Sequence, residues 1–174
     1  FLFTCHNVIS SLSVFQLLKE NNLNKLTIKW PNDIMTGKEK ISGILIENSV
    51  KGKLINHSVI GVGINVNQKK FKDLPNATSL FIETGLEFSL DSLANRLAEI
   101  FSKNFFLFDK NEDDLLEYYN SQLFLKNKDS NFKGLDNKNF SGKIICVNKK
   151  GQLRIRKTNN EEINYSENTI KLMP

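Results

Sequence analysis

Apolar residues recur at helical spacing near the start of the chain. They occupy Val8, Leu12, Phe15 and Leu18, and the polar pair Asn21-Asn22 follows them. Positions three or four apart lie on one face of a helix, whereas a polar pair is typical of its end. We therefore expect a helix that buries one face and ends before the first strand.

A second apolar stripe runs from Leu90 to Phe108 and predicts a longer amphipathic helix with Ser89 as its N-cap. Asn111 precedes three acidic residues, which suit the positive end of a helix dipole. This predicts another helix, which continues to about Phe124. Such stripes are typical of core packing, so these helices are expected to cover a sheet.

Strand patterns occupy the region between these helices. Residues 26–30 alternate apolar and polar side chains, and Pro31, which cannot donate to a strand ladder, ends that strand. After a turn at Thr36–Glu39, the apolar run Ile41–Ile46 predicts a second strand and a hairpin. The run Ile55–Val66 predicts a third strand. Because short turns join these segments, we expect a mostly antiparallel or mixed β-sheet.

The last part of the chain changes character. Residues 127–139 are polar and precede short apolar runs separated by turn residues, which predict a small C-terminal β-barrel. The expected fold class is α+β, a mixed β-sheet covered by helices plus this barrel. The expected domains are residues 1–127 and residues 137–174.

Composition narrows the class of protein. The 174 residues are 40% hydrophobic, enough for one real core, and no apolar run approaches the ~20 residues that span a bilayer. Cys5 and Cys146 are too few for a metal motif and are expected to be reduced, so we expect a cytoplasmic protein without a membrane partner. The net charge of +5 is not gathered in a basic arm, and no nucleic acid is expected as a partner.

The candidate chemistry lies in Lys29-Trp30-Pro31-Asn32-Asp33, with Lys40 seven residues after the aspartate. A hairpin brings these side chains near one another. Two ammonium groups beside one carboxylate attract anions such as phosphates and carboxylates. The alternative is a solvated surface salt bridge, which is common for lysines. Trp30 either walls the site or, more often for a lone tryptophan in an alternating strand, belongs to the core.

A glycine-containing strand supplies the second candidate. Gly61 and Gly63 lie two apart, so they clear the same face of the sheet for a flat ligand or a neighbouring backbone. A dinucleotide fingerprint is excluded because the third glycine and the following helix are missing. Asn65 and Asn67 either bind a ligand or end the strand, and the residue types alone leave both open.

Together, these segments resemble the catalytic domain of a biotin protein ligase, also called biotin-(acetyl-CoA-carboxylase) ligase or holocarboxylase synthetase. The run Lys29–Asp33, the run Lys40–Glu47 and the run Gly61–Asn65 occur in the family's order and near its spacing. The resemblance covers the whole chain and is strongest between Lys29 and Asn67. It implies a biotin/lipoate ligase-like catalytic domain, to which the C-terminal barrel would be attached.

The resemblance also implies a reaction. Biotin and ATP would form biotinyl-adenylate, with Mg²⁺ shielding the phosphates, and biotin would pass to a lysine of a biotin carboxyl carrier domain in acetyl-CoA carboxylase or a related carboxylase. Lys40 matches the family lysine that stabilises negative charge and contacts biotin, and Asp33 matches the aspartate that orients the acceptor lysine.

Further roles are carried over by position, and no metal ligand is assigned. The expected biotin-binding residues are Lys40, Gly43, Ile44, Gly61 and Gly63, and the expected ATP- or adenylate-binding residues are Lys29, Asn32, Ile64 and Asn65. Ala77-Thr78-Ser79-Leu80 resembles a family segment near the adenine.

One departure opens alternatives. The family carries a glycine- and arginine-rich loop upstream of these motifs, and this chain begins after it, so we expect an N-terminally incomplete sequence. The alternatives are an inactive fragment that binds biotin or the acceptor, and a lipoate ligase, which would lack the Lys29–Asp33 run. A barrel that binds nucleic acid is a more distant alternative. The sequence leaves open whether the chain forms a homodimer, which protein is the acceptor, and whether a DNA-binding domain gives the protein a repressor role.

Overall fold

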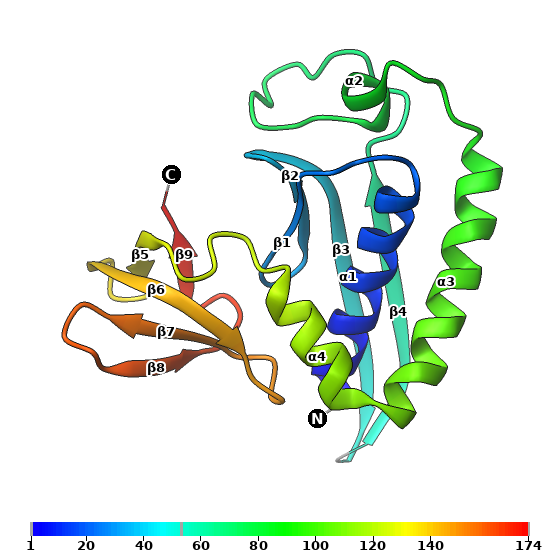
Figure 1. The fold of residues 1–174 in the computed structure, drawn as a ribbon. Coiled ribbons are helices and arrows are strands. Elements are labelled where there is room, and N and C mark those ends of the chain that lie inside the picture. Colours follow the sequence, from blue (N-terminus) through cyan, green and yellow to red (C-terminus); the bar gives the residue numbers. More distant parts are fainter. Residues whose placement is uncertain (1, 53, 174) are drawn as a thin grey trace.

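The computed structural model describes residues 2–52 and 54–173, which form two antiparallel sheets and four helices (Figure 1). This confirms the α+β class. The first sheet has the order β1-β2-β3-β4, and the second has the order β8-β7-β6-β5-β9. The strands of the first sheet are β1 (Leu26–Lys29), β2 (Asp33–Thr36), β3 (Glu39–Lys51) and β4 (Leu54–Ile64). Those of the second are β5 (Asp129–Gly134), β6 (Asn139–Val147), β7 (Leu153–Lys157), β8 (Glu162–Tyr165) and β9 (Ile170–Leu172).

The helices are α1 (Leu2–Glu20), α2 (Leu80–Thr84), α3 (Leu90–Lys110) and α4 (Glu112–Ser121). Helices α1, α3 and α4 lie on one side of the first sheet, and α2 lies beyond one end of it (Figure 1). The predicted stripe of α1 is buried, but the expectation of a single buried face was wrong, because Ser10, Ser11 and Ser13 are buried as well. Such small side chains let this helix approach its neighbours closely, and α1 contacts β1, β2 and β3 on one side and α3 and α4 on the other.

Side chains of the β3–β4 hairpin separate cleanly into two faces. Ile44 is 3% exposed and belongs to the hydrophobic core, against which Ile46, Ile60 and Val62 also pack. The intervening residues of β3 and β4 lie on the opposite face, where Leu45 is 63% exposed. This alternation leaves an open sheet face that the helices do not cover.

Several expectations differ in detail from the structure. The first sheet is antiparallel throughout rather than mixed, because each of its strands follows its neighbour through a short turn. The last helix ends at Ser121 instead of Phe124, and the Asn111 side chain makes no capping hydrogen bond. Ser89 does cap α3, since its hydroxyl accepts from Ser92 N. The short helix α2 was not predicted.

The second sheet begins within the polar segment that sequence patterns leave as a connection. In β5, Ser130 and Phe132 are buried and their neighbours Asp129 and Asn131 are exposed, an alternation weakened in the sequence by polar residues. The ring of Phe132 stacks on Phe140, which stacks in turn on Tyr165. The short C-terminal strands therefore share one core.

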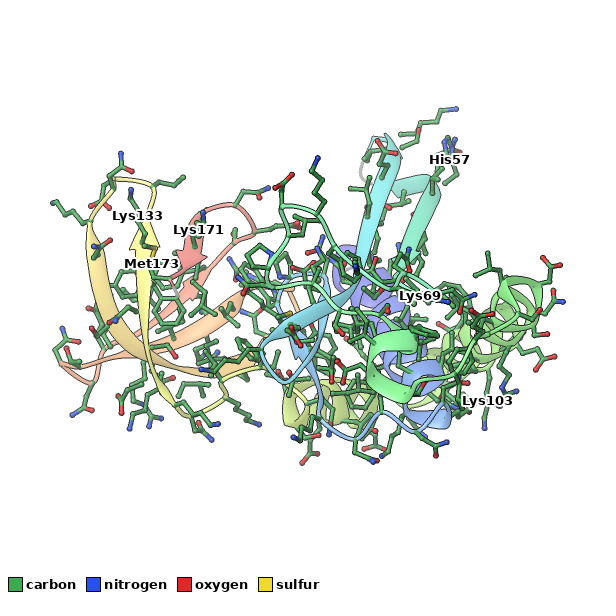
Figure 2. All side chains as sticks on the ribbon, turned by 90° about the horizontal axis from the view of Figure 1, so that it is seen from above. His57, Lys69, Lys103, Lys133, Lys171 and Met173 are labelled. Carbon is green, nitrogen blue, oxygen red and sulfur yellow. The ribbon has the colours of Figure 1, made fainter. Side chains whose placement is uncertain are left out.

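Charge is divided unevenly between the two sheets. Residues 126–174 contain eleven Lys or Arg against five Asp or Glu, a net charge of +6, whereas residues 1–125 contain thirteen against fourteen. Lys133 and Lys171 stand directly opposite each other on β5 and β9 (Figure 2). The positive charge of the chain thus belongs to its C-terminal unit.

The two units are joined through main-chain and side-chain hydrogen bonds. Ile28 N donates to Gln122 O, and Phe124 N donates to Ile28 O, which ties the chain after α4 to the edge of β1. Asn127 N then donates to Ile144 O in the second sheet. No helix in residues 2–52 and 54–173 has the length and apolar character needed to cross a membrane.

Candidate active site

The β1–β2 turn is fixed against β3. It contains a cis peptide bond between Trp30 and Pro31. Asn32 Nδ2 donates to Ile44 O at 2.7 Å, and Ile44 N donates to Asn32 O at 3.0 Å. The indole Nε1 of Trp30 donates to Gly151 O in the second sheet at 3.0 Å. The turn therefore holds both the site and the joint between the two units.

Lys40 and Asp33 form the central ion pair, with 2.5 Å between Nζ and Oδ1. In an uninterrupted strand, Lys40 would share the buried face of Ser42 and Ile44. The pairing of β2 with β3 shifts register between Ile34 and Met35, so that these adjacent residues face Ser42 and Lys40. Such a bulge re-aims side chains, and here it accounts for the position of Lys40 beside Asp33.

The glycines make room for this pair and for a ligand. Gly43 stands opposite Asp33 on one side and Gly63 on the other, and Gly61 stands opposite Leu45. A Cβ on Gly43 would lie 2.9 Å from Lys40 Nζ, so a side chain there would displace the ammonium. An open hollow of about 420 Å³ lies over these residues. Its lining is Asn32, Asp33, Lys40, Gly43, Ile44, Leu45, Gly61, Val62 and Gly63.

The pair is well placed to act on a charged ligand. The side chain of Lys40 is 47% exposed and that of Asp33 is 24% exposed. An ion pair this exposed contributes little to stability, so its ammonium is free to exchange the carboxylate for ligand oxygens. The arrangement supplies one cation, one carboxylate and a glycine floor that admits a flat group.

The predicted site residues divide into two groups. Six predicted site residues meet at the hollow, namely Lys40, Asp33, Asn32, Gly43, Gly61 and Gly63. Their proposed roles stay predictions. Ile44 borders the hollow, but its nearly buried side chain lies in the core, so it offers main-chain atoms. Ile64 packs partly buried against the same core. Asn65 Nδ2 donates to Thr78 O at 2.9 Å, which anchors a loop.

Lys29 borders a second cleft, of about 200 Å³, between the two units. Its lining includes Trp30, Lys171 and Asp33. Asp33 thus lies between the two hollows, with Lys40 on one side and Lys29 on the other. His57 lies on β4 at the outer part of the β3–β4 hairpin, exposed to solvent, where a catalytic task was not expected (Figure 2).

Leu45 is a site candidate that sequence reasoning missed. It is two residues after Gly43, so strand alternation puts both on the open face. The available signal was an apolar side chain at the position where the open face should be polar. An exposed leucine beside a glycine floor is suited to contact an apolar ligand.

The comparisons with known proteins fit this geometry. The profile of the Biotin/lipoate A/B protein ligase family matches residues 3–65, which contain α1, the Lys40–Asp33 pair and all three glycines. This segment is similar to that family. The Bifunctional ligase/repressor BirA of Bacillus subtilis is 31% identical over 103 residues, which cover 56% of this chain and 31% of that protein.

A second relative matches a shorter segment of the chain at a higher sequence identity. The biotin-(acetyl-CoA-carboxylase) ligase of Paracoccus denitrificans is 40% identical over 42 residues, which cover 24% of this chain and 18% of that protein. The chain therefore spans about a third or less of the length of these curated relatives.

Solved structures share the fold over nearly all of the chain. The apo biotin protein ligase of Aquifex aeolicus has a TM-score of 0.82 at 22% identity and covers 98% of this chain and 75% of its own. The same ligase in complex with biotin and ATP has a TM-score of 0.80 at 23% identity and covers 98% of this chain and 71% of its own. Both sheets of the biotin/lipoate ligase fold are thus present here.

Proposed function

We propose that this chain carries the catalytic core of a biotin protein ligase, which activates biotin with ATP and transfers it to a protein lysine. The observation that carries the proposal is the Lys40–Asp33 pair held over the Gly43 floor. Its support is the match of residues 3–65 to the Biotin/lipoate A/B protein ligase family and the similarity to the biotin-(acetyl-CoA-carboxylase) ligase of Paracoccus denitrificans.

In the first step, a biotin carboxylate oxygen attacks the α-phosphorus of ATP, and pyrophosphate leaves with the bonding electrons. Negative charge accumulates on the phosphoryl oxygens in the transition state. The Lys40 ammonium stabilises that charge more strongly than the charge of the ground state, which lowers the barrier.

In the second step, the amine of an acceptor lysine attacks the carbonyl carbon of the adenylate, an amide forms and AMP leaves. The acceptor arrives as an ammonium and must lose a proton before it attacks. Asp33 orients the ammonium and favours its deprotonation. When the Lys40 ammonium binds the adenylate oxygens, it releases the Asp33 carboxylate. Asp33 is then available to act on the acceptor lysine.

The ligand groups follow the two hollows. The biotin ring lies on Gly61 and Gly63 beside Leu45 and reaches Gly43, over which the Lys40 ammonium lies. The phosphates lie toward Lys29 and Asn32, and the adenosine side toward Ile64 and Asn65. In residues 2–52 and 54–173, no three His, Cys, Asp or Glu form a metal cage. Mg²⁺ would then bind chiefly through the ATP phosphates, as is common for this ion.

The partner in the proposal is the biotin carboxyl carrier domain of acetyl-CoA carboxylase or a related carboxylase. Its support in this chain is the +6 charge of residues 126–174 and the opposed pair Lys133 and Lys171, which favour an acidic partner. We also propose the division into a catalytic domain (1–127) and a small domain (137–174), a cytoplasmic location and a homodimer as the assembly to test.

The test is ATP–pyrophosphate exchange with the purified chain, with biotin as substrate and lipoate as control ligand. We expect exchange with biotin, none with lipoate and almost none in the Lys40→Ala variant. Exchange with lipoate alone would replace the proposal by lipoate activation. Absence of exchange in a folded sample would leave a domain that binds without activating, which isothermal titration with biotin would then identify.

A further inference from the structure

A loop forms hydrogen bonds with the main chain of Lys40, at a point on β3 that β4 does not reach. β4 pairs with β3 only as far as the Ser42–Ile64 pair. Beyond this pair, Lys40 N donates to Asn76 O at 2.7 Å and Thr78 N donates to Lys40 O at 3.0 Å. Residues 76–78 therefore replace β4 as the neighbour of the catalytic end of β3.

One carboxylate bridges this loop and the end of β2. Glu83, in the first turn of α2, accepts a hydrogen bond from Thr78 Oγ1 at 2.8 Å through Oε1. Its other oxygen, Oε2, accepts from Thr36 Oγ1 at 3.3 Å. Thr78 is fully buried and Thr36 is 6% exposed, so both hydroxyls need a partner within the protein. Thr36 ends β2, immediately before the turn that leads to Lys40.

Glu83 itself is held in place by the start of α2. Ser79 caps this helix, since its hydroxyl accepts from Ile82 N at 3.1 Å and donates to Gln68 O at 2.6 Å. The carboxylate thus bridges two elements that flank Lys40, the end of β2 and the loop on the other side. Catalysis needs the ammonium in one position, because a displacement of about 1 Å can cost on the order of a hundredfold in rate.

We propose that Glu83 is a positioning residue for Lys40, which acts by clamping the loop at residues 76–78 against β3 through the hydroxyls of Thr36 and Thr78. The clamp itself rests only on the hydrogen-bond geometry. Its effect on the reaction rests on the proposed ligase function.

Hydrogen exchange tests the clamp without reference to activity. In Glu83→Ala, the amides of Lys40 and Thr78 should exchange about tenfold faster, whereas amides in the β3–β4 ladder, such as those of Leu45 and Gly61, keep their protection. In Glu83→Gln, the side-chain oxygen can accept from one threonine hydroxyl and the amide N–H can donate to the other hydroxyl oxygen, so protection should return. Unchanged exchange at Lys40 and Thr78 in Glu83→Ala would overturn the proposal.

Kinetics tests the consequence. We expect kcat of biotin-dependent pyrophosphate exchange to fall about tenfold in Glu83→Ala and to recover in Glu83→Gln, with KM for ATP changed less than kcat. Glu87→Gln is the matched control, because Glu87 is exposed and pairs only with Lys69 among the described ion pairs. A loss of thermal stability with wild-type kcat would show a purely structural role and overturn the proposal.

The two arms separate this proposal from the function. If the wild-type chain shows no exchange with biotin, the ligase function fails, and the amide protection of Lys40 still decides whether Glu83 clamps the loop.

Discussion

The Lys40 ammonium lies in the space that the first atom of a side chain on Gly43 would occupy. A Cβ there would lie 2.9 Å from Nζ, 3.1 Å from Cε and 3.5 Å from the Asp33 carboxylate. Glycine is thus required at this position by the ion pair as well as by any ligand.

Gly43→Ala should abolish most of the exchange activity and leave the fold intact. The contact is with the flexible end of a lysine, which moves aside at little cost to the native state. We expect a loss of more than about tenfold in kcat/KM and an unfolding midpoint close to that of the wild type. Gly61→Ala is the comparison, since a Cβ there meets only Leu45 at 3.7 Å and beyond. Equal losses in both variants would assign the effect to filling of the hollow.

Lys40→Ala and Asp33→Asn should separate the half-reactions. Removal of the ammonium should slow adenylate formation, measured by pyrophosphate release, while the fold is retained. Loss of the carboxylate should mainly slow the transfer of biotin from preformed adenylate to an acceptor, measured in a single turnover. If each variant lost both half-reactions to the same extent, the division of roles would be wrong.

Leu45→Ala should weaken biotin binding without loss of stability. Leu45 is already 63% exposed, so its truncation should change the free energy of unfolding by less than about 0.5 kcal/mol. Contact of its side chain with biotin should contribute about tenfold in affinity, which calorimetric titration measures. Val50→Ala is the matched control, because Val50 is 56% exposed on the same strand and lies outside the hollow. Equal affinities in the two variants would remove Leu45 from the site.

Trp30→Phe should loosen the joint between the units. The change keeps an aromatic ring and deletes the bond from Nε1 to Gly151 O. We expect a loss of about 1 kcal/mol in the free energy of unfolding, measured in urea by circular dichroism. Trp30 is the single tryptophan of the chain, so its fluorescence in the wild type should report on the same joint. An unchanged unfolding midpoint would mean that this bond does not stabilise the joint.

The two thiols should react at very different rates. Burial, with smaller contributions from Asp109 and Glu112, raises the pKa of the Cys5 thiol to about 11. The thiolate is the reactive form, so Cys5 should stay unreactive at pH 8 and begin to react only as the pH approaches 11. Cys146 is partly exposed and should account for the native-state labelling with iodoacetamide. Rapid labelling of folded Cys146→Ser at pH 8 would contradict this.

Periodicity was enough to predict α1, α3 and the strands β1, β3 and β4. The expected hairpin between residues 26–30 and 41–46 was wrong, because the unpredicted strand β2 lies between them and pairs with both β1 and β3. The stripes of α1 and α3 and the alternation around β1 are each dominated by burial, which leaves its pattern in the sequence. Periodicity was misleading where the side chains of an element are only partly buried. Phe105 matches the apolar stripe of α3 yet is 40% exposed, and the polar residues of β5 predict a connection instead of a strand.

The motifs predicted that Asp33 and Lys40 would meet, and the structure brings them together. How they meet could not be predicted, because a bulge is set by register between strands and has no signature in the spacing of Lys40 and Gly43. The role of Glu83 was hidden for a related reason. Its partners, Thr36 and Thr78, are 47 and 5 residues away, and only the folded loop brings them together.

Main-chain atoms of Ile28, Gln122, Phe124, Asn127 and Ile144 make several of the hydrogen bonds at the joint between the two sheets. Side chains of Trp30 and Asn120 make others. Replacement of one side chain by another leaves the main-chain bonds in place, and only proline at a donor position removes one. Divergence of sequence can therefore proceed a long way without turning one sheet relative to the other. This accounts for a fold that aligns over 98% of the chain with an Aquifex aeolicus protein that shares 22% of its residues.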